Sequence, residues 1–123
     1  VLVLDASGLL WAGTEYSGVW TAPSEGSRFR LILDLPAIAV PISGNNVRAL
    51  AARGDAIYIG TEGQGLKRLH RRLDYIEDLS PWLALALADA GFANPAEIRV
   101  HGLRFAPSGE LWAATSEGAF ALD

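Results

Sequence analysis

Three loops in the sequence carry the residues whose types and spacing favour binding chemistry. Glu15 and Glu62 each follow a threonine directly, and Glu117 follows one after a serine. Tyr16 and Gln64 stand beside them and add a phenol and a carboxamide. Carboxylate, phenol and amide groups together can hydrogen-bond a polar ligand or hold a cation. We therefore take these five residues as candidate ligand contacts, although a purely structural role as polar loop residues is the more common one.

Residue patterns typical of catalysis are missing from the sequence. His70 and His101 are the two histidines, and neither has an Asp or Glu at metal-ligand spacing. No serine lies in a nucleophile-elbow motif. We therefore expect a non-enzymatic protein, with no catalytic residue, no bound metal and no cofactor.

Composition narrows the class of partner. The 123 residues carry a net charge of −4 without an extended basic stretch, so nucleic acid is not an expected partner. The longest uncharged stretch, Leu35 to Val47, is interrupted by prolines and is shorter than the roughly 20 apolar residues of a membrane span. The chain has no cysteine and no methionine, and the missing methionine predicts a fragment or processed product of a longer protein.

A threefold repeat must position the candidate contacts. Each unit has a turn glycine, an aliphatic residue and an aromatic, which is Trp11, Tyr58 or Trp112. Small residues follow, and then a threonine in each unit: Thr14, Thr61 and Thr115. The units recur at roughly 50 residues, close to the period of β-propeller blades. We interpret these six residues as structural anchors, with the aromatics packed between neighbouring sheets rather than stacked on a ligand.

Short apolar runs separated by Gly, Pro, Asn and Ser clusters predict an all-β chain. We expect a β-propeller fragment of nearly three four-stranded antiparallel blades in a single partial domain, 1–123. Blade 1 covers about 1–35, blade 2 about 47–79 and blade 3 about 97–123, where the last strand is missing. An insert at about 80–96 separates the second and third blades.

The insert predicts one short helix near 81–90. Ser80 suits the N-cap, Pro81 the first turn and Gly91 the C-terminal cap. The alanines of the segment favour helix over strand. Just before the insert lies a basic run that we expect on a solvated outer strand, with acids of the adjoining strand as partners: Asp74, Glu77 and Asp78. The run consists of Lys67, Arg68, His70, Arg71 and Arg72.

Antiparallel pairing places the candidate contacts on one face. The connections between the second and third strands of every blade leave from the same end as the connections between blades. The loops with Glu15, Glu62 and Glu117 therefore share a face with the linker between blades 1 and 2, Pro36 to Asn46, and with the insert at 80–96. A face with long loops is a common place for a ligand or partner. We expect Asp5 and Asp55, at the other end, to bond to backbone amides of their turns.

The repeat resembles the two-component regulator propeller repeat. The first unit matches it at Asp5, Gly8, Leu10, Trp11, Gly13, Thr14 and Gly18. The second matches at Gly54, Ile57, Tyr58, Gly60, Thr61, Gly65 and Leu66. The third matches at Gly109, Leu111, Trp112, Thr115 and Gly118, with Ala114 in place of a glycine.

This resemblance implies a ligand-sensing or binding module of a signalling protein, in the periplasm or outside the cell. We expect an unidentified small molecule, glycan or protein on the loop face. The short uncharged stretches predict no membrane insertion by this segment. Because propellers close with roughly four to eight blades, further blades are expected from the parent chain or from other copies. The stretch from Ser24 to Phe29 is more distantly similar to the Asp-box motif of sialidase-like propellers.

Two alternative functions follow from these observations. A glycosidase-like fragment would use Glu15, Glu62, Asp55 and Arg48 around a central cleft. A protein-interaction scaffold would use the insert at 80–96 as its contact.

Overall fold

The computed structural model describes residues 1–15, 18–23, 30–32, 46–71, 75–88 and 98–122, and these contain eleven strands and one helix. Sheet 1 consists of β1 (Leu2–Leu4), β2 (Leu9–Gly13), β3 (Val19–Pro23) and β4 (Arg30–Ile32). Sheet 2 consists of β5 (Val47–Arg53), β6 (Ala56–Thr61), β7 (Leu66–His70) and β8 (Tyr75–Asp78). Sheet 3 consists of β9 (Val100–Phe105), β10 (Leu111–Thr115) and β11 (Gly118–Leu122).

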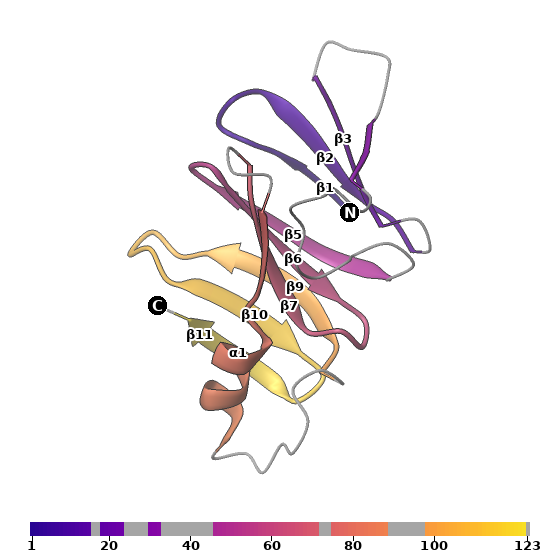
Figure 1. The fold of residues 1–123 in the computed structure, drawn as a ribbon. Helices are drawn as coiled ribbons and strands as arrows, with labels where there is room; N and C mark the ends of the chain where they lie inside the picture. Colours follow the sequence, from indigo (N-terminus) through magenta and orange to yellow (C-terminus); the bar gives the residue numbers. More distant parts are fainter. Residues whose placement is uncertain (16–17, 24–29, 33–45, 72–74, 89–97, 123) are drawn as a thin grey trace.

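All strands within the three sheets pair antiparallel with their neighbours in sequence. The sheets follow one another in chain order, with sheet 2 between the other two (Figure 1). The predicted all-β chain with antiparallel sheets is therefore confirmed. Strand β4 is the fourth strand of the predicted blade 1, and residues 24–29 and 33–35 of that blade lie outside the described residues.

Side-chain alternation along the strands divides the core into two layers. The first lies between sheets 1 and 2, where Trp11 and Val19 pack with Ile57 and Ile59. The second lies between sheets 2 and 3, and its buried members are Ala51, Leu66, Leu79, Leu83, Ile98, Val100, Leu111 and Ala113. Because successive side chains of a strand point to opposite faces, sheet 2 contributes to both layers.

Two glycines allow the sheets to approach each other closely. A Cβ atom built on Gly60 of β6 would lie 2.7 Å from Cγ1 of Val100 in β9. A Cβ atom on Gly13 of β2 would lie 2.4 Å from Cγ1 of Val47 in β5. In the first two repeats, the glycine at or next to the end of the second strand is thus required for close packing between neighbouring sheets.

The three aromatic anchors do not share one environment. Trp11 is buried, and Tyr58 packs edge-on against Phe105 of sheet 3, with ring centroids 5.3 Å apart. Trp112, expected in the core, is 46% exposed. It lies on the face of β10 opposite Leu111, which is buried against sheet 2. Trp112 is exposed because no described residue covers that face of sheet 3.

The repeated threonines have one structural role. Each threonine hydroxyl donates to the carbonyl of the glycine that ends its loop, at 2.9 Å for Thr14, 2.8 Å for Thr61 and 2.8 Å for Thr115. The accepting glycines have positive φ angles of 72°, 70° and 131°: Gly18, Gly65 and Gly118. The threonine and glycine of the repeat therefore close the loop that connects the second and third strands.

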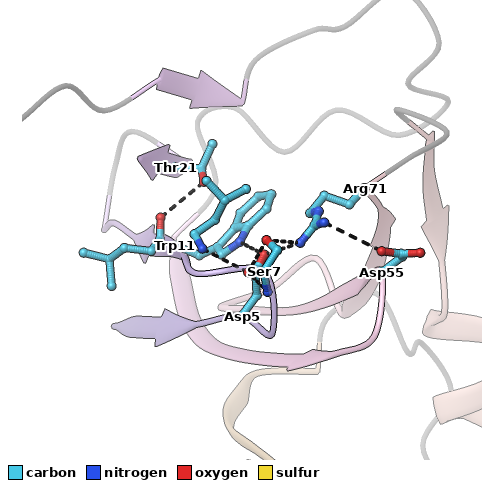
Figure 2. A network of polar contacts seen from close by, with 8 residues as sticks. Asp5, Ser7, Trp11, Thr21, Asp55 and Arg71 are labelled. Carbon is cyan, nitrogen blue, oxygen red and sulfur yellow. Dashed lines mark hydrogen bonds and ion pairs between the residues drawn. The ribbon is translucent and has the colours of Figure 1, made fainter. Parts of the chain in front are cut away.

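A buried carboxylate links sheets 1 and 2 (Figure 2). Asp5 accepts hydrogen bonds from the backbone amides of Ser7 and Leu9 at 2.9 and 3.0 Å, as expected for a turn aspartate. It also accepts from the indole Nε1 of Trp11 at 2.9 Å and from Nη1 of Arg71 at 2.6 Å. Arg71 follows β7, so the fully buried carboxylate of sheet 1 is neutralised by sheet 2.

Burial and hydrogen bonding have opposite effects on the pKa of Asp5. Burial alone would raise the pKa of the carboxyl group, but the hydrogen bonds from Ser7, Trp11, Leu9 and Arg71 outweigh it. The net result is a pKa well below the usual range of an aspartate. Asp5 is therefore held as a carboxylate in the folded protein.

Helix α1 covers Ser80–Leu87 and packs against β7 and β11, beside β11 in Figure 1. Leu79, rather than Ser80, occupies the N-cap, and the hydroxyl of Ser80 instead accepts a hydrogen bond from the amide of Leu66 at 3.3 Å. Pro81 lies in the first turn as predicted, and Gly91 lies outside the described residues. Within the described chain, no helix is long and apolar enough to cross a membrane.

The basic run on β7 was expected on a solvated outer strand, and this expectation is wrong. β7 pairs with both β6 and β8, and Lys67 is buried. Its ammonium group donates to the carbonyl of Gln64 at 2.8 Å and lies 3.6 Å from Asp78. Two expected partners are confirmed, because Asp78 lies beside Lys67 and Glu77 pairs with Arg68, and Asp74 lies outside the described residues.

Candidate functional site

The three candidate loops lie at one edge of the molecule, which we call the loop edge. A backbone hydrogen bond from the amide of Val47 to the carbonyl of Thr14 connects sheets 1 and 2 there, and within sheet 2 the amide of Glu62 donates to the carbonyl of Asn46. Glu62 in turn forms an isolated β-bridge with Arg99, just before β9. The loops of sheets 1, 2 and 3 are thus fixed relative to one another by main-chain contacts rather than by side chains alone.

Glu62 is the centre of charge at the loop edge. It forms an ion pair with Arg48 of β5, and its Oε1 lies 3.6 Å from Nε of Arg99. The hydrogen bond from Arg48 is the main cause that lowers the pKa of Glu62, despite some desolvation, and the charges of Arg99 and His101 act in the same direction. Glu62 therefore remains ionised, and two arginines flank it where two sheets meet.

A cavity of about 230 Å³ adjoins this ion pair, between sheets 1 and 2. Glu15 lines one side of it, and Asn46 and Arg48 line another. The cavity thus offers a carboxylate, an amide and a guanidinium to one occupant. Such a mixed set of donors and acceptors suits a polar molecule with several hydroxyl groups or with both charges.

The remaining predicted contacts are less involved. The backbone amide of Gln64 donates to the hydroxyl of Thr61 at 3.0 Å, and its carbonyl accepts a hydrogen bond from Lys67. Glu117 is exposed at the loop of sheet 3. Tyr16 lies outside the described residues. Of the five predicted contacts, the structure brings Glu15 and Glu62 to the neighbourhood of one cavity and its ion pair.

Sequence reasoning missed Asn46 and Arg99 as members of this site. Both lie directly before the first strand of a sheet, and the position before a strand at the loop edge is a signal that could have found them. Arg48 was considered only as part of the glycosidase alternative.

The glycosidase set is not assembled in the described residues. Asp55 lies in the turn that precedes β6, and Glu62 directly follows the same strand, so the two carboxylates are at opposite ends of β6. Asp55 is 3.7 Å from Arg71, close to the Asp5 network rather than to Glu15.

The fold matches solved structures from B. thetaiotaomicron. One is the extracellular domain of BT4673, named as a one component system, with a TM-score of 0.67 and 16% identity over 98% of this chain. A second structure of that domain, named as a hybrid two component system, gives a TM-score of 0.69 and 19% identity over 99% of the chain. In both cases the chain spans 14% of the length of the matched structure. At these identities the likeness concerns the fold.

No family model matches the sequence, and a comparison with curated proteins finds no match.

Proposed function

We propose that the chain is a segment of a β-propeller that serves as a non-catalytic sensing or binding module in the extracytoplasmic region of a signalling protein. The observation that carries this proposal is the fold likeness over nearly the whole chain to an extracellular domain of a protein named as a one component or hybrid two component system. The resemblance of the sequence repeat to the two-component regulator propeller repeat supports the same assignment.

The packing of the sheets supports the propeller. Trp11 and Tyr58 both point from their own sheet toward the next one in the chain, and Trp112 occupies the equivalent position of sheet 3. A β-propeller is built by the radial repetition of similar sheets around a central axis. In this proposal a further blade covers Trp112.

The loop edge is the proposed ligand surface. Its cavity presents Glu15, Asn46 and Arg48 together, and the ion pair with Glu62 holds Arg48 in place. The proposed ligand is a polar small molecule or glycan rather than an apolar compound.

Two measurements test this proposal. An antibody raised against the chain detects the protein in spheroplasts of its source organism, and external protease is expected to remove the signal while a cytoplasmic marker persists. A signal that survives until the cells are lysed contradicts the extracytoplasmic assignment.

Thermal unfolding with a panel of oligosaccharides tests binding. Glu15→Gln is expected to abolish any stabilisation, whereas Glu117→Gln, a matched change on another loop, is expected to keep it.

A further inference from the structure

A second cavity lies between sheets 2 and 3 and α1, apart from the cavity of the loop edge. Its volume is about 260 Å³. Arg53 contributes from the end of β5 and Gly109 from the turn that joins β9 to β10, at the edge opposite the loops. Trp82 contributes from α1. This cavity shares no lining residue with the one beside Glu15.

Arg53 is a cation without a carboxylate partner among the described residues. Its guanidinium donates to the carbonyl of Gly109 and lies over the ring of Phe105, with 5.2 Å between Cζ and the ring centroid. A Cβ atom on Gly109 would lie 3.1 Å from Nη1 of Arg53, so glycine at this turn leaves room for the guanidinium. The turn and the ring therefore hold the cation in place before any ligand arrives.

The other walls are flat and largely apolar. Tyr58 and Phe105 meet edge to face, and Trp82 is 55% exposed although it lines the cavity. The guanidinium of Arg68 lies 5.9 Å from the Tyr58 ring, and its charge is balanced by Glu77. Arg53 is thus the unbalanced charge of a cavity that is also lined by three aromatic residues, Tyr58, Trp82 and Phe105.

We propose that this cavity binds a small aromatic carboxylate. The carboxylate would accept hydrogen bonds from Arg53, and the ring would lie among Tyr58, Trp82 and Phe105. A volume of about 260 Å³ is below the roughly 300–1,000 Å³ of pockets for drug-sized ligands, which limits the occupant to about one ring. The inference does not depend on the proposed sensing role, because it uses a different cavity and a different ligand chemistry.

Nitrogen-edited NMR of the 123-residue chain tests the proposal with phenylacetate as the probe. Phenylacetate is expected to shift the Nε–H signal of Arg53, the indole N–H signal of Trp82 and the amide of Gly109, while the indole signal of Trp112 stays in place. Uncharged phenylacetamide is expected to bind about tenfold more weakly, because a charge-assisted hydrogen bond is lost. Acetate, which has no ring, is expected to cause no saturable shift.

Variants separate the site from a general effect of charge. Arg53→Gln is expected to weaken phenylacetate binding about tenfold, and Arg53→Lys to weaken it less, with the amide spectrum of both variants still that of the folded chain. Arg104→Gln, a matched change at an exposed position of β9 that lines neither cavity, is expected to leave the affinity unchanged. Galacturonate, a sugar carboxylate without an aromatic ring, is the competing probe. The proposal would be overturned if phenylacetate and phenylacetamide bind equally, if Arg53→Gln binds phenylacetate as well as the wild type does, or if galacturonate binds more tightly than phenylacetate.

Discussion

Asp5 differs from its counterparts in the other two repeats. Counted back from the aromatic anchor, the same position holds Ala52 in the second repeat and Ala106 in the third. The carboxylate that ties Trp11 to Arg71 therefore exists only between sheets 1 and 2. The energetic role of Asp5 can be tested without changing the rest of the repeat.

Asp5→Asn is expected to destabilise the chain by on the order of 2–3 kcal/mol at pH 7, because a buried anion that accepts charge-assisted bonds becomes a neutral amide. Urea unfolding followed by tryptophan fluorescence measures the change. Asp55→Asn serves as the control, since Asp55 is exposed and its ion pair with Arg71 spans 3.7 Å. Exposed pairs contribute roughly 0–1 kcal/mol. Equal losses from the two substitutions would contradict the structural role of Asp5.

The difference between wild type and Asp5→Asn is also expected to depend on pH. The pKa of Asp5 is lower in the folded than in the unfolded chain, so its contribution to stability is complete above the unfolded pKa and disappears as pH falls through the lower folded pKa. The gap in unfolding free energy is therefore expected to narrow below about pH 4. Titration of both proteins by urea unfolding from pH 7 to pH 3 measures it, and a constant gap would refute the assignment.

At the scale of the elements, Gly60 tests the packing of β6 on β9. Gly60→Ala is expected to cost about 1–3 kcal/mol, because its Cβ atom would overlap Val100 between two sheets. Gly102→Ala is the control within a strand, where the added Cβ atom would meet only Ala114 at an ordinary 3.5 Å. Thermal unfolding of both variants measures the contrast. A similar loss at Gly102 would point to backbone flexibility rather than close packing.

The sequence was sufficient to predict the strands because their signals are local. Turn glycines, alternating apolar residues and the threonine at each loop recur in every unit. It was less informative about the start of α1, where Leu79 rather than Ser80 is the N-cap, because the Ser80 hydroxyl bonds to Leu66 of a neighbouring strand. The sequence also wrongly predicted a solvated Lys67. Its ammonium group is buried, where it donates to the carbonyl of Gln64 and is balanced by the nearby carboxylate of Asp78.

The candidate sites were harder to predict because they form between sheets. Glu15 and Glu62 were found from the repeat, but the arginines around Glu62 come from the start of β5 and from the residue before β9. The contact of Arg53 with Phe105 joins parts of two sheets that no sequence spacing connects. Contacts of this kind depend on the packing angle between neighbouring sheets, and that angle cannot be predicted from the residue pattern of a single sequence.

At the scale of the whole molecule, both outer sheets present apolar side chains to solvent. Leu2 and Leu4 of sheet 1 are exposed, as is Trp112 of sheet 3. Apolar sheet faces of this kind favour association. The isolated 123-residue chain is therefore expected to self-associate, and Trp112→Glu is expected to shift it toward the monomer in sedimentation velocity. Leu85→Glu, an exposed apolar position on α1, is the control. A wild-type chain that stays monomeric at all concentrations would contradict the propeller proposal.

The tie between Asp5 and Arg71 has a consequence for the synthesis of the chain. The two residues are 66 positions apart, so a ribosome that adds about 5–20 residues per second needs roughly 3–13 seconds between them. During that interval the nascent first sheet holds a carboxylate beside Trp11 without its cationic partner, and the apolar face that sheet 2 later covers stays open. Transiently exposed apolar surface is prone to aggregation, so sheet 1 is expected to be the vulnerable part of the chain until sheet 2 has been synthesised.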